Sequence, residues 1–379
     1  MRIAVRKETL DHERRVALVP DAAGRLVKAE HSVVVEAGAG KRAGFSDETF
    51  KEAGVEVAAD LAAAVKGADV VFEVQPITES AVDTLPAEVA LIGFLQPNTN
   101  LDLIQKLARA KVTSFSLELL PRISRAQSMD ALSSQASVAG YKAVLVAAER
   151  LPKFFPMLMT AAGTIAPARV LVLGAGVAGL QAIATARRLG AVIEAYDVRP
   201  AVKEEVQSLG ARFIELELEA QEGTGGYARE QSEEFLRRQR ELIGSHVAAS
   251  DVVITTAAIP GRKAPVLVTA DMVEAMRPGS VVVDLAAETG GNVEGSKAGE
   301  ELDVKGVALY GALNLPSTMP VHASQLYSKN VTSLLEHLAP EGVLKLDFED
   351  EITKGTCVTH SGEVVHPMVK ELLGVGAKT

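Results

Sequence analysis

The sequence predicts an α/β protein built from two Rossmann-like, doubly wound domains. Short β-branched runs alternate with helical patterns from the start of the chain to Tyr310, which is the rhythm of parallel sheets covered by helices. A glycine-rich turn follows one of these runs directly and opens a helical pattern. At 379 residues the chain is long enough for two domains that each bury a core.

The strands are expected in two groups, one for each domain. The first third of the chain contains five β-branched runs: Ile3–Val5, Ser32–Val35, Asp69–Phe72, Val89–Ile92 and Val112–Phe115. The middle contains six stronger runs: Val170–Leu173, Val192–Tyr196, Arg212–Leu216, Asp251–Thr255, Ser280–Asp284 and Gly306–Tyr310. Six strands suit a complete doubly wound sheet.

Two long helical patterns, at about Met129–Arg150 and His322–Leu338, are expected to join the domains. The tail beyond the second helix is irregular, with one possible strand at Gly342–Leu346, and is too short for a core of its own. We therefore expect the tail to pack on the first domain. The predicted domains are a discontinuous α/β domain of residues 1–128 and 320–379, and a Rossmann domain of residues 129–319.

Charge and cysteine content exclude several classes of protein. The formal net charge of −10 argues against nucleic acid or an anionic membrane surface as a partner, because both need clustered cations. Cys357 is the only cysteine, and no Cys/His spacing typical of zinc is present, so we expect neither a disulfide within the chain nor a metal. Met1–Lys7 lacks the apolar segment of a signal peptide, and no apolar run is long enough to span a membrane. We therefore expect a cytoplasmic protein.

Gly174, Gly176 and Gly179 follow a β-branched run at the start of a helical pattern. In this context the spacing is a dinucleotide fingerprint: Gly174 permits a tight turn, Gly176 lets the backbone approach a pyrophosphate, and Gly179 lets helix and strand pack closely. Ala175 and Val177 lie between these glycines, where helix N-terminal amides would bind phosphate. The alternative is that the glycines serve tight packing alone.

Asp197 ends the next strand-like run and strengthens this interpretation. A carboxylate at this place can accept hydrogen bonds from both ribose hydroxyls of adenosine, and it would repel a 2′-phosphate. The sequence therefore favours NAD(H) over NADP(H), with Val198 as a further contact. Arg199 could also lie near the same ribose, which leaves the preference partly open. We expect residues 129–319 to bind NAD(H), with the NAD cleft between the two domains.

Several segments together resemble the superfamily of alanine dehydrogenases and nicotinamide nucleotide transhydrogenases, and they extend over nearly the whole chain. They are Arg6–Thr9, Glu13–Pro20, Gly174–Gly179, Thr255–Arg262 and Val283–Asn292. Within the superfamily, Pro121–Asp130 is similar to a loop in the NAD(H)-binding component of proton-translocating transhydrogenases.

The chemistry of the two reactions separates these relatives. Interconverting an amino acid and a keto acid moves a proton as well as a hydride, so that site needs an acid/base group, whereas hydride transfer between nicotinamides needs none. The dehydrogenases carry a Lys after the strand that matches Val70–Phe72 and a His after the next strand. Here the corresponding stretches, Phe72–Pro76 and Gly93–Pro97, contain neither, and Glu288 stands where the dehydrogenases place Asp. The resemblance therefore implies a transhydrogenase component.

The resemblance places Arg122, Gln127, Asp130 and Ser133 around the nicotinamide and its carboxamide as catalytic residues. Gln127 would also reach across to the second nucleotide. An amide and a hydroxyl can pair with a carboxamide, and holding two nicotinamides about 3–3.5 Å apart is most of the catalysis. The alternative is a helix N-terminal cap at Ser128 or Asp130, which needs one such residue rather than a cluster.

The glycine-rich segment Glu222–Arg229 contains a single Tyr and is typical of a lid. The resemblance places Tyr227, counted among the catalytic residues, and Gly226 in such a mobile loop near the adenosine. It also suggests Gln239, on the helix beyond, as a further cofactor contact. An ordinary exposed connection is the alternative for this segment.

Further candidates follow the fourth and sixth runs of the second domain. Thr256 to Ala258 and Asn314 would line the nucleotide cleft if the sheet is doubly wound. His322, His360 and His366 have no spacing typical of metal ligands or a catalytic triad, so we expect structural or surface roles for them.

The resemblance also implies an assembly. The chain would be the NAD(H)-binding subunit of a Si-face-specific, proton-translocating NAD(P)⁺ transhydrogenase, with direct hydride transfer between NADH and NADP⁺ coupled to proton movement. Since the chain has one dinucleotide fingerprint and no expected membrane span, a partner subunit would bind NADP(H) and another would span the membrane. A homodimer at the cytoplasmic face of a bacterial inner membrane is implied as well. The alternatives are an alanine or related amino acid dehydrogenase and a noncatalytic NAD-binding regulatory subunit.

Overall fold

The computed structural model describes residues 1–215, 233–258 and 263–374. The chain divides into two compact units. Unit 1 comprises Met1–Gln135 and Pro316–Thr379, and unit 2 comprises Ala136–Leu315. In the described part of the chain, no helix is both long enough and apolar enough to cross a membrane.

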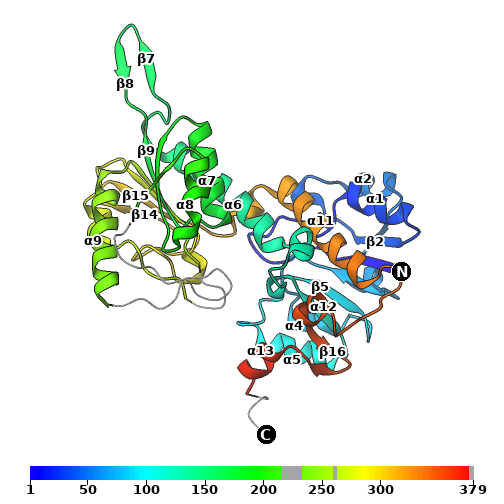
Figure 1. The fold of residues 1–379 in the computed structure, drawn as a ribbon. Helices are drawn as coiled ribbons and strands as arrows, with labels where there is room; N and C mark the ends of the chain where they lie inside the picture. The colour runs from blue at the N-terminus through cyan, green and yellow to red at the C-terminus, as the bar shows by residue number, and fades with distance from the viewer. Residues whose placement is uncertain (216–232, 259–262, 375–379) are drawn as a thin grey trace. The chain divides into compact units, whose positions relative to one another are not determined.

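Unit 1 contains an eight-stranded sheet (Figure 1). Its strands are β1 (Arg2–Val5), β2 (Ser32–Glu36), β3 (Glu56–Ala58), β4 (Val70–Phe72), β5 (Ala90–Gly93), β6 (Thr113–Ser116), β16 (Cys357–His360) and β17 (Glu363–Val364). They lie in the order β17-β16-β6-β5-β4-β1-β2-β3. β1 to β6 are parallel, whereas β16 and β17 are antiparallel additions at the β6 edge. The strand order reverses between β1 and β4, which makes this the topological switch point of unit 1.

Helices cover both faces of this sheet, because successive strand side chains point to opposite sides. The helices are α1 (Pro20–Lys28), α2 (Asp47–Glu52), α3 (Leu61–Val65), α4 (Glu79–Val82), α5 (Leu101–Arg109), α11 (Pro320–Leu338), α12 (Glu351–Thr356) and α13 (Pro367–Leu372). Ile3 and Val5 belong to a core shared with α1, α2 and α11. Ala4 belongs to the opposite core, with α3, α4, α5 and α13.

Unit 2 contains a seven-stranded sheet in the order β11-β10-β9-β12-β13-β15-β14. Its strands are β9 (Arg169–Leu173), β10 (Val192–Tyr196), β11 (Arg212–Phe213), β12 (Val252–Thr255), β13 (Val281–Asp284), β14 (Glu301–Val304) and β15 (Val307–Gly311). All pair in parallel except β14, which is antiparallel to β15. The six parallel strands have the same relative order as the six in unit 1. The predicted fold class, α/β with two Rossmann-like doubly wound domains, is confirmed.

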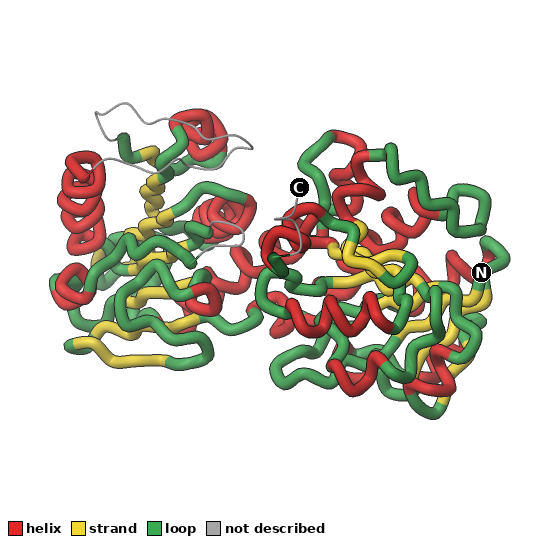
Figure 2. Tube along the Cα trace, turned by 90° about the horizontal axis from the view of Figure 1, so that it is seen from below, coloured by secondary structure: helices red, strands yellow, loops and turns green. Residues whose placement is uncertain are grey.

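The helices of unit 2 lie on both sides of its strands (Figure 2). They are α6 (Ala131–Arg150), which begins in unit 1, α7 (Val177–Arg188), α8 (Lys203–Ser208), α9 (Glu233–Ala249) and α10 (Ala270–Glu274). Val170 and Val172 share a core with α6, α7 and α8. Leu171 and Leu173 share the other core with α9 and α10. The sheet is therefore a fixed support for the turns at its strand ends.

The tail lies in unit 1, and the expected strand at Gly342–Leu346 is wrong. This segment forms no strand, and its Leu344 and Leu346 pack instead as partly buried side chains against the core under α11. The sheet is extended by β16, whose Thr359 hydroxyl contacts Ser114 at 2.7 Å and lies beside β6. The sequence also failed to predict β3 and β14.

A two-stranded hairpin projects from unit 2 and belongs to neither sheet (Figure 1). It consists of β7 (Leu158–Thr160) and β8 (Gly163–Ile165). Its apolar side chains are exposed to an unusual degree: Met157 by 56%, Met159 by 73% and Ile165 by 45%. Exposed apolar side chains gathered on one projection are typical of an interaction surface.

Candidate functional site

The turn between β9 and α7 needs its glycines for different reasons. Gly174 has a φ of +102°, and its amide donates to the Tyr196 carbonyl oxygen at 2.8 Å. A Cβ on Gly179 would lie 1.8 Å from the Gly174 carbonyl oxygen, so only glycine lets α7 pack this closely. Gly176 has a φ of −78°, and a Cβ there would meet nothing within 4 Å. The space over Gly176, next to the N-terminus of α7, is therefore open, as a pyrophosphate site requires.

Asp197 directly follows β10, and its carboxylate is fixed beside this turn. Its Oδ2 atom accepts a hydrogen bond from the Ala175 amide at 2.7 Å, and its Oδ1 atom accepts one from the Arg199 amide at 2.9 Å. The Arg199 guanidinium adds two more, from Nε to Oδ1 and from Nη2 to Oδ2, both at 3.0 Å. The structure thus brings together Ala175, Asp197 and Arg199, with Val198 between the last two, and their contact with a ribose stays a prediction.

Thr256 follows β12 and braces the same turn from the neighbouring strand. Its hydroxyl donates to the Gly174 carbonyl oxygen at 3.0 Å, and its amide donates to the Leu173 carbonyl oxygen at 2.8 Å. Ala258 lies two residues further on and is exposed. Thr256 is therefore part of the turn, while Ala258 makes no contact with the described residues that would define a role.

A buried carboxylate that was not among the predicted site residues holds this edge of unit 2. Asp284 ends β13, is fully buried, and accepts hydrogen bonds from the Thr255 hydroxyl and from the amides of Ala286, Asn292 and Val293. Asn292 then donates to the carbonyl oxygens of Ala257 and Pro265, both at 2.8 Å. An ionisable residue that ends an apolar strand was the available sequence signal. Asp284 and Asn292 fix the loops that follow β12 and β13.

The remaining predicted contacts of unit 2 differ in their surroundings. Asn314 has a φ of +42°, and its amide donates to the Glu288 carboxylate at 3.0 Å. Gln239 is buried on α9 and donates to the Tyr196 hydroxyl at 3.0 Å, so it supports the strand that leads to Asp197. Gly226 and Tyr227 lie outside the described residues, and the lid stays a prediction.

In unit 1, the loop between β6 and α6 contains the 3₁₀ helix η3 (Ser124–Met129) and is firmly anchored. Ala126 and Met129 are buried in the core. Asn330 of α11 donates to the Ser128 carbonyl oxygen at 2.9 Å and accepts from the Ser134 hydroxyl at 2.7 Å. One side chain therefore ties the loop to the first turn of α6.

The four predicted nicotinamide residues lie on this loop and the start of α6. Asp130 accepts hydrogen bonds from the amide and the hydroxyl of Ser133, at 2.9 and 2.6 Å, so it caps α6. Arg122 and Gln127 have exposed side chains. Capping accounts for Asp130 and Ser133 but not for Arg122 and Gln127, and the contact of all four with a nicotinamide stays a prediction.

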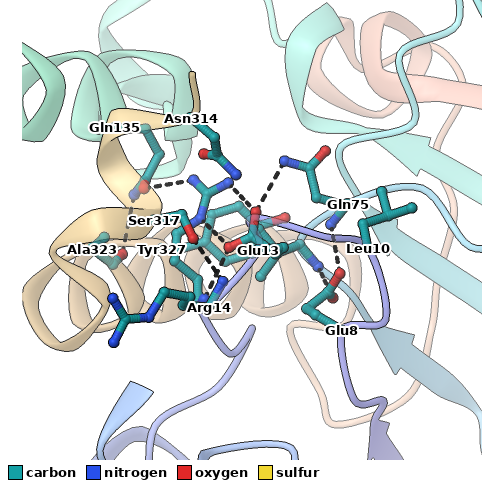
Figure 3. A network of polar contacts seen from close by, with 12 residues as sticks. Glu8, Leu10, Glu13, Arg14, Gln75, Gln135, Asn314, Ser317, Ala323 and Tyr327 are labelled. Carbon is teal, nitrogen blue, oxygen red and sulfur yellow. Dashed lines mark hydrogen bonds and ion pairs between the residues drawn. The ribbon is translucent and has the colours of Figure 1, made fainter. Parts of the chain in front are cut away.

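A polar network, buried around Glu13 and Arg15 and exposed at Gln96, lies beyond the carboxyl ends of β1, β4 and β5 in unit 1 (Figure 3). Arg15 forms an ion pair with Glu13 at 2.6 Å and donates to Gln135 at 2.8 Å. Gln75, which follows β4, donates to Glu13 at 3.0 Å and accepts from Gln96, which follows β5, also at 3.0 Å. Two neutral amides are thus joined at adjacent strand ends.

A second region of the network places Arg6 between two carboxyl groups, Glu8 at 3.2 Å and Glu73 at 2.8 Å. Glu8 also accepts from the amides of Val74 and Gln75. Burial raises the pKa of Glu8, against the opposing effects of Arg6 and these two amides. The Oε1 atom of Glu73 has no hydrogen-bond partner among the described residues. Burial raises the pKa of Glu73 to about 8, against the opposing effect of Arg6. At neutral pH Glu73 therefore holds a proton, which relieves its repulsion with the neighbouring Glu8 carboxylate.

The fold and the turn in unit 2 define the class: a two-unit α/β protein with a dinucleotide-binding turn. Residues 4–139 match the family model of the alanine dehydrogenase/PNT N-terminal domain, and residues 143–367 match the model of the C-terminal domain. The chain belongs to the alanine dehydrogenase/PNT family. The family predicted from the sequence segments is confirmed. Among the described residues, no group of three or more His, Cys, Asp or Glu side chains is placed to hold a metal ion.

Individual relatives are more informative than the family as a whole. The chain is 47% identical to the first part of NAD(P) transhydrogenase subunit alpha from Rhodospirillum rubrum, over the full length of both chains. It is similar to a solved transhydrogenase structure from Sinorhizobium meliloti, with a TM-score of 0.86 and 44% identity over 97% of this chain and 100% of that one. An alanine dehydrogenase of Halomonas elongata is 31% identical, over 99% of this chain and 97% of its own length.

Proposed function

We propose that this chain is the NAD(H)-binding component of a proton-translocating NAD(P) transhydrogenase. It passes a hydride directly between NADH and NADP⁺ that is bound by a partner subunit. A membrane-spanning partner couples this transfer to proton movement, so the chain works at the membrane without spanning it.

The observation that carries this proposal is the hydrogen bond between Gln75 and Gln96. These residues lie in the two stretches where, by resemblance, the dehydrogenases have a Lys and a His. Neither amide can act as a general acid or base near neutral pH, and each uses the other as a partner. This arrangement suits a reaction that moves a hydride and no proton.

The comparisons support the same choice. Full-length identity is 47% to a transhydrogenase subunit and 31% to an alanine dehydrogenase. The two proteins share the fold, so the fold alone does not separate them, whereas the residues at the strand ends of unit 1 do.

The residues of unit 2 account for binding of NAD(H). The N-terminus of α7 and the open backbone at Gly176 would hold the pyrophosphate, and Asp197 would accept the ribose hydroxyls. Bound NADH supplies the hydride. We infer that Arg122 and Gln127 orient the nicotinamide carboxamide from the loop in unit 1, while Asp130 and Ser133 hold the start of α6 in place.

The projecting hairpin supports a homodimer. Met157, Met159 and Ile165 present apolar surface that unit 2 itself does not cover. A second copy of this chain is the partner we propose for that surface, since homo-oligomers are the commonest soluble assemblies. The NADP(H)-binding and membrane-spanning subunits are separate partners.

The first experiment separates this function from amino acid dehydrogenation. The purified full-length chain is mixed with NADH, pyruvate and ammonia, and NADH absorbance is followed. We expect no oxidation above the rate without protein, because Gln75 and Gln96, which lie where the dehydrogenases have a Lys and a His, cannot transfer a proton. Steady turnover would identify a dehydrogenase instead.

The second experiment tests the transhydrogenase reaction and the place of Gln127. Hydride exchange is measured after reconstitution with an NADP(H)-binding subunit, using Gln127→Asn and, as a matched control, Gln207→Asn at an exposed position of α8. We expect about a tenfold to hundredfold loss for Gln127→Asn with unchanged NADH affinity, since a small displacement of the ring has effects of that size. Exchange that is absent in the unaltered protein would favour a regulatory subunit.

A further inference from the structure

The Asp197 carboxylate has all its acceptor positions filled by two neighbouring residues. Two hydrogen bonds come from backbone amides, those of Ala175 and Arg199, and two come from the Arg199 guanidinium. An ionised carboxylate has about four lone-pair positions. The guanidinium therefore occupies the positions that the backbone leaves.

A ribose that binds this carboxylate needs the same positions. The two hydroxyls of an adenosine ribose donate side by side to one carboxylate, much as the two N–H groups of a guanidinium do. The Ala175 amide cannot move away from Asp197 without disrupting the turn between β9 and α7, because it is part of the backbone of that turn. Only the Arg199 side chain can yield, and with 25% of its surface exposed it has solvent to turn into.

We propose that the Arg199 guanidinium is a built-in competitor for the adenosine ribose at Asp197, so that binding of NAD(H) displaces it. Arg199 then weakens NAD(H) binding and speeds release of the nucleotide. This role rests on the proposed function, because it presumes that the turn binds NAD(H). It differs from the expectation that Arg199 is a simple cofactor contact, which would strengthen binding.

The ion pair also explains how a cation can lie beside this ribose in a site that prefers NAD(H). The charge of the carboxylate holds the guanidinium in the ion pair and opposes a 2′-phosphate. If the carboxylate is replaced by a neutral amide, its charge no longer competes with a phosphate for the guanidinium. We therefore expect Arg199 to bind a 2′-phosphate when the negative charge at position 197 is removed.

The first test measures the dissociation constant of NADH by isothermal titration calorimetry on the full-length chain. Arg199→Met removes the guanidinium and keeps an extended apolar stem, whereas Arg199→Lys keeps the charge without the two-pronged contact. Arg212→Met, at an exposed arginine where β11 begins, removes one cation elsewhere in unit 2 as a matched control. We expect Kd to fall about two- to fivefold for Arg199→Met, and also to fall for Arg199→Lys, because partly exposed ion pairs contribute on that scale. The control should leave Kd unchanged.

Weaker or unchanged NADH binding in both Arg199 variants would overturn the proposal and make Arg199 a direct contact or a bystander. If the unaltered chain binds no NADH at all, the proposed function itself fails, which is a different result. Dissociation rates measured by stopped flow give an independent readout, and slower release from Arg199→Met is expected.

The second test uses NADPH. Asp197→Asn should bind NADPH about tenfold more tightly than the unaltered protein, since a charge-assisted contact to phosphate replaces a repulsion. The double variant Asp197→Asn, Arg199→Met should lose that gain. Equal NADPH affinity of the single and the double variant would show that Arg199 is not the receptor.

Discussion

Two glycines of the turn between β9 and α7 serve different purposes. One allows close packing within the protein, and the other leaves open space for the proposed nucleotide. Gly179 is required by the protein, because a Cβ there would collide with the Gly174 carbonyl oxygen at 1.8 Å. Gly176 has ordinary backbone angles and open space, so the protein would accept a side chain there. If the turn binds a pyrophosphate, stability and binding should respond separately to substitution at the two positions.

We expect Gly179→Ala to lower the free energy of unfolding by about 2–3 kcal/mol or more, because the overpacked turn must move. Gly176→Ala should change it by no more than about 0.5 kcal/mol while raising the Kd of NADH at least about tenfold, since its methyl group takes the space of the phosphate. Urea unfolding and calorimetric titration of both variants measure this. Equal loss of stability in both would contradict the assignment.

The proton on Glu73 makes stability depend on pH. Burial raises the pKa of Glu73 from an ordinary 4.5 to about 8. A carboxyl group whose pKa is higher in the folded than in the unfolded state contributes stability that is fully present below pH ~4.5 and is lost as pH rises through ~8. Deprotonation would leave Arg6 beside two buried anions, Glu8 and Glu73.

Glu73→Gln should therefore flatten the fall in stability between pH 6 and pH 9. We expect the unaltered protein to lose on the order of 2 kcal/mol more than the variant over this range. Unfolding by urea at both pH values gives the comparison, with Glu52→Gln, an exposed carboxyl on α2, as the control. A slope in Glu73→Gln as steep as in the unaltered protein would place the proton elsewhere.

At the scale of single residues, the sequence predicted what depends on the local backbone. The roles of Gly174 and Gly179 follow from a strand that turns into a helix, and this pattern is visible in a short window. The pairing of Arg199 with Asp197 is a choice of side-chain conformation, and the contact of Gln75 with Gln96 needs two strands in register. Neither of these can be derived from spacing along the chain.

At the scale of elements, helix α6 packs directly against the turn between β9 and α7, although no residue of α6 belongs to that turn. A Cβ on Gly140 of α6 would lie 2.1 Å from the Ala178 carbonyl oxygen in the first turn of α7. The two helices therefore meet with their backbones almost in contact. Since Ala178 lies within the glycine fingerprint, α6 supports the helix end that we propose to bind phosphate.

Gly140→Ala should both destabilise unit 2 and weaken NADH binding, although residue 140 is outside the fingerprint. We expect a loss of about 1–3 kcal/mol, the usual effect of overpacking, despite the better helix propensity of alanine. Gly244→Ala in α9 is the matched control, because its Cβ would meet only the Met272 side chain, at 3.6 Å and beyond. That variant should be as stable as the unaltered protein or up to about 1 kcal/mol more stable. Thermal unfolding with and without NADH measures both effects.

The strands that the sequence analysis did not predict are short, and their formation depends on pairing with other strands more than on their own hydrophobic pattern. β14 is half exposed along its length and pairs only with β15, so it lacks the apolar run of a central strand. β16 pairs with β6, which lies far away in the sequence, so a short sequence window does not identify it as a strand. Gly342–Leu346 has an alternating pattern, yet its leucines are used to cover a core rather than to enter a sheet. Long buried strands were predictable because hydrophobic periodicity alone identifies them.

At the scale of the whole molecule, the hairpin gathers exposed apolar side chains on one projection of unit 2. Met159 is 73% exposed, and Met157 is 56% exposed. A hairpin of two short strands has little stability by itself, so packing against a partner surface would stabilise it. In the proposed homodimer, the second copy provides this surface.

Met159→Asp should therefore shift the protein from dimer to monomer without changing its NADH affinity. A charge in a desolvated apolar contact costs several kcal/mol, enough to dissociate a dimer at micromolar concentration. Analytical ultracentrifugation gives the mass, with Val343→Asp, at an apolar side chain of unit 1 that is 69% exposed, as the matched control. A Met159→Asp variant that remains dimeric would place the interface on another surface.

The discontinuity of unit 1 has a consequence for how the protein is made. Its parallel strands are complete at Ser116, but α11, whose Tyr327 and Val331 cover one face of them, is translated only after the whole of unit 2. Domains generally fold as units while the ribosome is still working. The newborn chain thus carries a sheet face that α1 and α2 cover only in part through the synthesis of unit 2, and exposed apolar surface of this kind favours aggregation. The unit that starts first is finished last.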